Sequence, residues 1–119
     1  MLLSLFDSSP STQLTSTYNR QALHQMHRDI VTGVPEGAVN LGHSPVCDVQ
    51  GLYIPHRVIS VQAHPEFSGF IMSSILNARR DQGIFGDDLF QSGLSRAEKA
   101  HDGVLVSAVI WRFLLSGDL

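Results

Sequence analysis

One junction constrains the fold of this chain more than any other feature: an apolar strand that ends at a histidine and passes at once into a helix. Residues 58–63 (VISVQA) are typical of a β-strand, and Pro65 ends it because proline has no backbone donor for a sheet. Apolar residues at three- and four-residue spacing over residues 67–80 then predict a helix with one apolar face. That face consists of Phe67, Phe70, Ile71, Ile75 and Ala78.

The segments on either side of this junction predict a layered α/β fold. Residues 46–54 form a second strand-like run, and the short connection Pro55-His56-Arg57 predicts a hairpin with residues 58–63. Residues 103–115 predict a closing helix, with Asp102 as its N-cap and Gly117 as its terminator. Apolar side chains cover much of its circumference, so we expect this helix to be buried on more than one side.

The remaining segments give weaker patterns. We predict strands at residues 2–6, 22–31 and 39–41, a turn at residues 34–37, and a polar loop with a short helical turn at residues 87–97. Residues 7–19 are rich in Ser and Thr, which predicts a flexible loop. No interdomain linker is visible, so residues 1–119 are expected to form one unit.

Composition excludes several classes of protein. Of the 119 residues, 43% are hydrophobic and 16% are charged, which excludes a solvated disordered chain. The eight basic residues form no cluster and the net charge is -3, so nucleic acid is not an expected partner. A single cysteine, Cys47, excludes a disulfide framework. No apolar run approaches the roughly 20 residues of a membrane span, so we expect a cytoplasmic protein without a membrane partner.

His64 and Glu66 form the sharpest candidate site. They are two residues apart after a strand, so an extended chain would place both side chains on one side. A carboxylate there can bond one imidazole nitrogen and leave the other free as a base, as in a nucleophile–His–acid triad. The alternative is a strand-end histidine with an ordinary hydrogen bond beside a solvated glutamate.

A metal site is a second alternative. The chain has six histidines, and His24, His27 and His64 could converge with Glu66. No His-Glu-x-x-His or comparable signature is present, and the other histidines fall in predicted loops and turns. We therefore predict neither a metal site nor a cofactor.

Three motifs of this chain resemble one known family over about residues 20–115. They are Gln25-Met26-His27-Arg28-Asp29-Ile30-Val31, Ser44-Pro45-Val46-Cys47-Asp48-Val49-Gln50-Gly51 and Arg57-Val58-Ile59-Ser60-Val61-Gln62-Ala63-His64-Pro65-Glu66-Phe67, followed by Asp102-Gly103 and Trp111-Arg112-Phe113-Leu114. The chain resembles the C-terminal half of a class I, triad-type glutamine amidotransferase domain of the GMP-synthase-like kind found in fungi. The resemblance implies half of a flavodoxin-like α/β fold, with a small mixed sheet and packed helices.

The resemblance also implies roles for six residues. His64 would be the general base that later protonates the leaving ammonia, and Glu66 would orient it. The segment Met26, His27, Arg28 and Asp29 would line part of a pocket for glutamine or a related amide. Many relatives carry small residues beside this histidine, whereas this chain has Met26 and Arg28.

The nucleophile of that family has no counterpart here. Its cysteine lies in a Gly-x-Cys-x-Gly turn, and no such motif occurs in this sequence. Cys47 lies beside Asp48 rather than a cation, so we expect it to be packed and inert. We therefore expect a truncated amidotransferase-like chain, inactive in isolation, whose partner would be an N-terminal half-domain, a synthetase or a second copy. The alternatives are a non-catalytic assembly module and a repurposed amide-processing protein of fungal secondary metabolism.

Overall fold

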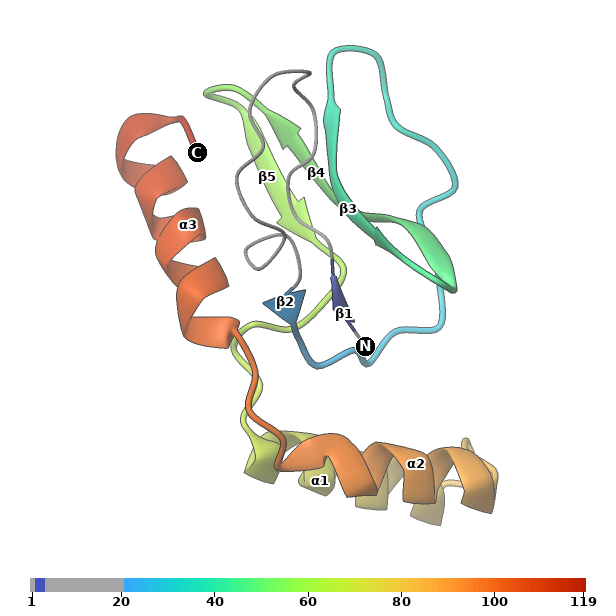
Figure 1. Cartoon of the computed structure of the whole chain (residues 1–119). Coiled ribbons are helices and arrows are strands. Elements are labelled where there is room, and N and C mark those ends of the chain that lie inside the picture. The colour runs from blue at the N-terminus through green and yellow to red at the C-terminus, as the bar shows by residue number, and fades with distance from the viewer. Residues whose placement is uncertain (1, 4–20) are drawn as a thin grey trace.

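The computed structural model describes residues 2–3 and 21–119 and shows a mixed α/β fold, as predicted (Figure 1). The remainder of the predicted strand at residues 2–6 and the predicted loop at residues 7–19 lie outside the described residues. In chain order the elements are β1 (Leu2–Leu3), β2 (Gln21–Ala22), β3 (Val39–Ser44), β4 (Cys47–Ile54), β5 (Val58–Val61), α1 (Gly69–Asp81), α2 (Asp87–Ala97) and α3 (Gly103–Ser116).

The main sheet contains three strands in the order β3-β4-β5. The predicted hairpin is confirmed: β4 and β5 pair antiparallel with Ile54 opposite Val58. The expectation of a mixed sheet was wrong, because every strand pair in the described part of the chain is antiparallel. Short turns join β3 to β4 and β4 to β5, and a parallel pair would have needed a long crossover connection instead.

The segment predicted as a strand over residues 22–31 is extended but pairs at few positions. Only Gln21–Ala22 form a strand, and farther on two isolated bridges join His24 to His64 and Val31 to Val49. Leu23 packs in a cluster with the sheet, whereas Met26 packs against the helices α1 and α2. The segment therefore crosses between two cores and follows no single neighbouring strand.

Helix α1 begins close to the predicted position, with the Ser68 side chain accepting a hydrogen bond from the Ile71 backbone N–H. Its predicted apolar face was wrong. Met72 and Leu76 are the buried residues, and Phe70 and Ile71 are exposed. The buried positions are four residues apart, so they form a helical stripe displaced around the helix from the expected one.

Helix α2 replaces the loop predicted over residues 87–97. Phe90, Gly93 and Ala97 are buried at three- and four-residue spacing. Phe90 and Ala97 form one cluster with Met72 and Leu76 of α1, so α1 and α2 pack as a pair. A helix that packs on one side needs only one narrow apolar stripe. Most residues of this segment are therefore polar, and the sequence pattern was interpreted as a loop.

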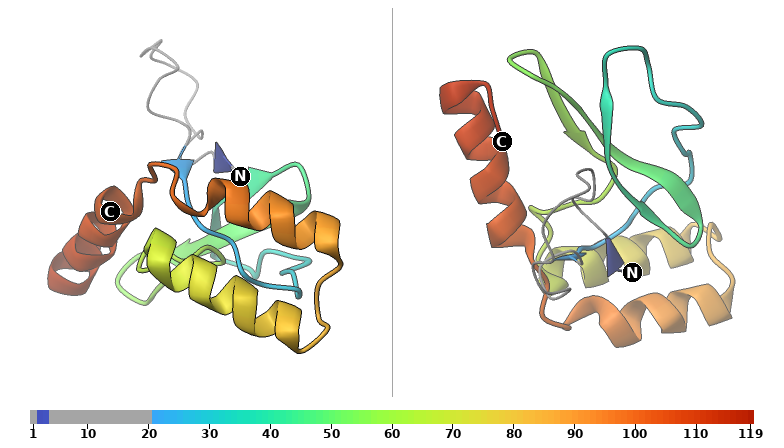
Figure 2. Two further views of the ribbon diagram at one scale, coloured as in Figure 1. Left: turned by 90° about the horizontal axis from the view of Figure 1, so that it is seen from below. Right: turned by 45° about the horizontal axis from the view of Figure 1, so that its top comes forward.

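Helix α3 has the predicted bounds but not the predicted burial. Gly117 ends it in the left-handed conformation with φ of 80°, and its N–H bonds the Phe113 carbonyl. Val106 packs in the cluster of Leu23, Leu41 and Ala63, which lies between α3 and the sheet. Only one side of α3 is buried, because α1 and α2 lie together at a distance from it (Figure 2). None of the helices in residues 21–119 is long and apolar enough to cross a membrane.

Candidate functional site

His64 lies just beyond β5, at the point where the chain turns toward α1. Its backbone N–H donates to the His24 carbonyl at 2.9 Å, and the backbone N–H of Gln62 donates to the Gln50 carbonyl at 2.8 Å. Pro65 and Glu66 form a turn, and the Phe67 N–H donates to the His64 carbonyl at 3.3 Å. His64 is therefore held by the main chain on both sides.

The predicted contact between His64 and Glu66 is present. Nδ1 of His64 lies 2.8 Å from Oε1 of Glu66. The turn at Pro65 brings the two side chains together, whereas the sequence predicted an extended chain. The imidazole also stacks on the Phe67 ring, with centroids 4.0 Å apart and planes inclined by 10°. A carboxylate and an aromatic ring thus fix the imidazole, while its Nε2 has no hydrogen-bond partner among residues 21–119.

The contact with His64 affects the pKa of the Glu66 carboxyl group. Desolvation by burial raises its pKa, but the hydrogen bond with His64 and the charge of that ring outweigh this effect. The net result is a pKa below the ordinary value of 4.5. Glu66 therefore stays ionised near neutral pH, which suits a group that orients an imidazole and stabilises its protonated form.

Two other histidines, His24 and His101, form a ring contact that the sequence did not predict. The rings of His24 and His101 have centroids 4.8 Å apart, and Nε2 of His24 is buried without a hydrogen-bond partner among the described residues. Burial lowers the pKa of His24, the nearby His101 lowers it further, and Glu98 opposes the shift. His24 is therefore neutral at neutral pH.

Asp102 is the N-cap residue of α3, as predicted, and it also connects α3 to the end of β2. Its carboxylate accepts a hydrogen bond from the Ala22 N–H at 2.7 Å, and its own N–H donates to the Ala22 carbonyl at 2.8 Å. No side-chain bond from Asp102 caps α3. Asp102 thus attaches the segment that contains His24 to the start of α3. The only sequence signal was the Asp102-Gly103 pair of the family resemblance.

The predicted substrate segment, residues 26–29, makes hydrogen bonds and packing contacts of its own. His27 is hydrogen-bonded through both ring nitrogens, Nδ1 to the Asp29 carbonyl at 2.8 Å and Nε2 to the Gln25 side chain at 2.7 Å. Met26 is half-buried against α1 and α2, and Arg28 and Asp29 are exposed. Within the described residues, no hydrogen bond or ion pair joins residues 26–29 to His64 or Glu66.

A chain of side-chain hydrogen bonds leads from this segment into the sheet. The Gln25 amide donates to Gln50 at 3.3 Å, and the Gln50 amide donates to the Ser44 hydroxyl at 3.0 Å. Gln50 is fully buried, at 0% exposure. A buried amide needs its partners, so this chain fixes the position of residues 25–27 relative to β4.

Cys47 is buried, as predicted, and its thiol donates to the Val49 carbonyl at 3.3 Å. No contact joins it to His64 in the part of the chain that the structure describes. The same residues contain no group of three or more His, Cys, Asp or Glu side chains able to hold a metal ion. His24, His27, His64 and Glu66 therefore do not converge as the metal alternative required.

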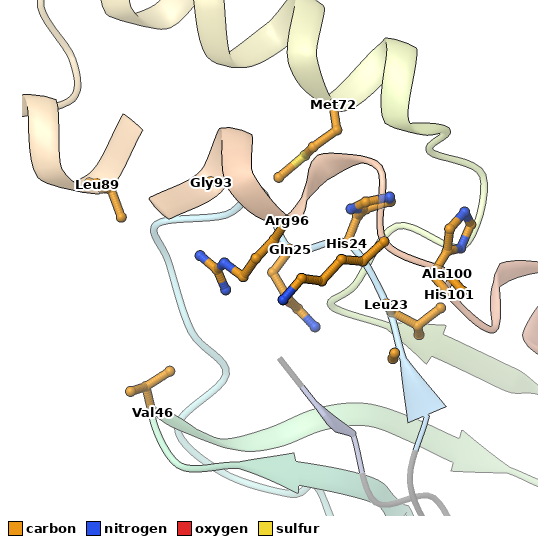
Figure 3. A pocket seen from close by; sticks show the side chains of 12 residues that line it. Leu23, His24, Gln25, Val46, Met72, Leu89, Gly93, Arg96, Ala100 and His101 are labelled. Atoms are coloured by element: carbon orange, nitrogen blue, oxygen red, sulfur yellow. The ribbon is translucent and has the colours of Figure 1, made fainter. Parts of the chain in front are cut away.

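A cavity of about 580 Å³ opens between the segment after β2 and helices α1 and α2 (Figure 3). Figure 3 shows His24, Gln25, Arg96 and His101 among the side chains around it. His64 and Glu66 do not line it. The cavity is therefore separate from the His64–Glu66 pair.

Comparison with known proteins supports a similarity to glutamine amidotransferase-like proteins. The chain is 32% identical over 114 residues, 91% of its length, to a Schizosaccharomyces pombe protein provisionally named glutamine amidotransferase-like. The chain is similar to glutamine amidotransferase-like proteins. A protein of Saccharomyces cerevisiae, provisionally named a glutamine amidotransferase, is 31% identical over 93 residues, 78% of the chain. The matched stretches span only 46% and 37% of these two relatives. No protein-family profile matches the chain. No solved structure matches it either.

Proposed function

We propose that this chain is the base-bearing, C-terminal half of a class I glutamine amidotransferase domain of the fungal GMP-synthase-like kind. The observation that carries the proposal is the His64–Glu66 contact of 2.8 Å, with the second imidazole nitrogen left without a partner among the described residues. The similarity to two amidotransferase-like proteins supports the same assignment. The proposed substrate is glutamine or a related amide.

The proposed chemistry divides between this chain and a thiol that it lacks. A cysteine thiolate would attack the side-chain amide carbon of glutamine, and His64 would give a proton to the leaving nitrogen. Ammonia would depart and a thioester would remain, which water then cleaves to glutamate with His64 as base. Glu66 would hold the imidazole in the required tautomer.

The one cysteine of this sequence cannot take the part of the nucleophile. The Gly-x-Cys-x-Gly motif is absent, and Cys47 is buried with its thiol bonded to a backbone carbonyl. The proposal therefore places the nucleophile outside these 119 residues, and a synthetase is the proposed acceptor of the ammonia. The isolated chain is expected to be inactive.

Ammonia release from glutamine tests the proposal. The isolated chain should release none above a buffer blank. Mixed with the part of the S. pombe relative outside the matched stretch, it should release ammonia, and His64→Ala should slow this by about 10²–10⁴-fold. His43→Ala is the matched control, because His43 is an exposed histidine of β3. Release by the isolated chain that His64→Ala abolishes would contradict the claim of inactivity. Release by the mixture that is insensitive to His64→Ala would contradict the assignment of the base.

A non-catalytic assembly module is the second candidate function. It is favoured by the apolar side chains that α3 exposes, among them Trp111 and Leu115. It predicts that the chain binds a partner and that His64→Ala changes neither that binding nor any ammonia release. A repurposed amide-processing enzyme differs only in substrate. It predicts that replacing the exposed Arg28 changes the choice of amide, since Met26 is engaged in the helical core.

A further inference from the structure

Helix α3 has an apolar stripe on the side that faces away from the sheet. The stripe consists of Val104, Ala108, Trp111 and Leu115, all exposed, and Val104, Trp111 and Leu115 are 86%, 63% and 74% exposed. At about 100° per residue these four side chains lie within one narrow sector of the helix. The buried residues Val106 and Phe113 lie on the opposite side.

This stripe carries no charge. Arg112 is the only charged residue of α3, and it lies to one side of the stripe. In Figures 1 and 2 no other helix or strand of the described residues covers the side of α3 that faces away from the sheet. A contiguous apolar surface rimmed by polar groups is typical of an interaction site in a soluble protein.

The spacing of the stripe identifies the kind of partner. Its members are separated by four, three and four residues, which is the repeat that aligns side chains for packing against another helix. Ala108 in the middle of the stripe leaves room for a close approach, at the roughly 8–10 Å axial separation of packed helices. A strand or an extended peptide presents side chains to one face at every second residue, and this repeat does not match the spacing of the stripe.

We propose that the stripe of α3 docks an amphipathic helix of the polypeptide that makes up the remainder of the relatives' length. The two relatives are more than twice as long as the stretch that this chain matches, so their larger part has no counterpart in the matched region. The proposal deepens the proposed function and rests on it, because the polypeptide that docks would be the one that bears the nucleophile.

A second copy of the chain fits the stripe less well. A stable dimer buries about 800 Å² on each partner. The stripe has four side chains, of which only Trp111 is large, and one helix of this length spans only about 21 Å. Two copies that met through these stripes alone would remain well below that area, whereas the proposed partner would also contact the chain at His64.

Binding to the unmatched part of the S. pombe relative tests the proposal. Titration calorimetry with wild-type chain should give a 1:1 complex, and Leu115→Glu should weaken it by at least about tenfold. Ala108→Phe should also weaken it, because the larger side chain blocks a close helix. The matched control is Leu105→Glu, an identical change at an exposed leucine about 90° around the helix from the centre of the stripe. It should change the affinity less than about twofold.

Three outcomes would overturn the proposal. They are no binding of wild-type chain at about 100 µM, equal weakening by Leu115→Glu and Leu105→Glu, or a dimer of the chain alone that only Leu115→Glu dissociates. All variants are first checked by circular dichroism, and their exposed positions predict unchanged helix content. A complex that forms through the stripe but releases no ammonia from glutamine would uphold the docking surface and reject the proposed function.

Discussion

His24 and His64 face each other across an isolated antiparallel bridge, in which the His64 N–H donates to the His24 carbonyl at 2.9 Å. Two residues before His24, Ala22 is bonded in both directions to Asp102 at the start of α3. The backbone of the candidate base is therefore connected to the sheet, to the segment after β2 and to α3. This arrangement predicts that changes remote from the imidazole affect its position.

His24 should make the protein less stable in acid. Its pKa is below 6.5 in the folded protein, so the unfolded chain binds a proton more readily. Stability from this residue is fully present above pH 6.5 and is lost as the pH falls below that value, by up to about 1.4 kcal/mol per pH unit. Urea unfolding between pH 5 and 8 measures this slope.

His24→Phe keeps a ring in the site and removes the titration, so its slope between pH 5 and 6.5 should be smaller than that of the wild type. His43→Gln is the matched control, because His43 is exposed, and it should keep the wild-type slope. Equal slopes for wild type and His24→Phe would show that His24 is not responsible.

Glu66→Gln should remove a small, pH-dependent contribution to stability. The pKa of Glu66 is lowered on folding, so its contribution is present above pH 4.5 and is lost as the pH falls through the folded value. The side chain is largely exposed, so water screens the interaction and the effect should stay below about 1 kcal/mol at pH 6. Unfolding of wild type and variant at pH 3 and pH 6 measures it. A difference of the same size at both values would exclude the ionised carboxylate as the source.

Asp102→Ala should destabilise the fold by about 1–3 kcal/mol, because the partly buried Ala22 N–H loses its acceptor. Chemical unfolding at neutral pH gives the change in free energy. Asp48→Ala removes an exposed carboxylate of β4 and should cost less than about 0.5 kcal/mol. If Asp48→Ala lowered the free energy of unfolding as much as Asp102→Ala, the hydrogen bond to Ala22 would not be the cause of the loss.

Gly103→Ala should destabilise the protein although alanine favours helices. A β-carbon at Gly103 would collide with the Pro65 carbonyl oxygen and crowd the His101 ring. We expect a cost of about 1–3 kcal/mol from this overpacking, against a gain of at most about 1 kcal/mol in helix propensity. Gly33→Ala is the control, because no atom lies within 4 Å of its β-carbon position. A more stable Gly103→Ala variant in thermal unfolding would contradict this packing.

Local sequence patterns were sufficient where neighbouring residues determine the structure. The hairpin of β4 and β5 follows from two strand-like runs with a short connection, and Gly117 ends α3 because it adopts a positive φ. The contact of His64 with Glu66 is similarly local, since only Pro65 stands between them. The sequence predicted an extended chain at Pro65, whereas the structure has a turn there. Both conformations bring the side chains of His64 and Glu66 together, so the contact was predicted although the turn was not.

Patterns failed where a distant segment decides which side of an element is buried. Phe90, Gly93 and Ala97 form a helical stripe only because Met72 and Leu76 pack against it. The polar residues between them made α2 resemble a loop. The His24–His101 pair joins segments far apart in sequence, and no local spacing predicts such a contact.

The sequence by itself determined an α/β chain with a histidine–glutamate pair at the junction of a strand and a helix, because alternation, proline and helical spacing act over a few residues. Only the tertiary structure decided that α3 is buried on one side and exposes an apolar stripe on the other. The same apolar residues are compatible with a helix that is buried on several sides and with a helix that exposes an apolar stripe for a partner. Which of the two occurs depends on the surfaces that pack against the helix, and these come from the rest of the fold.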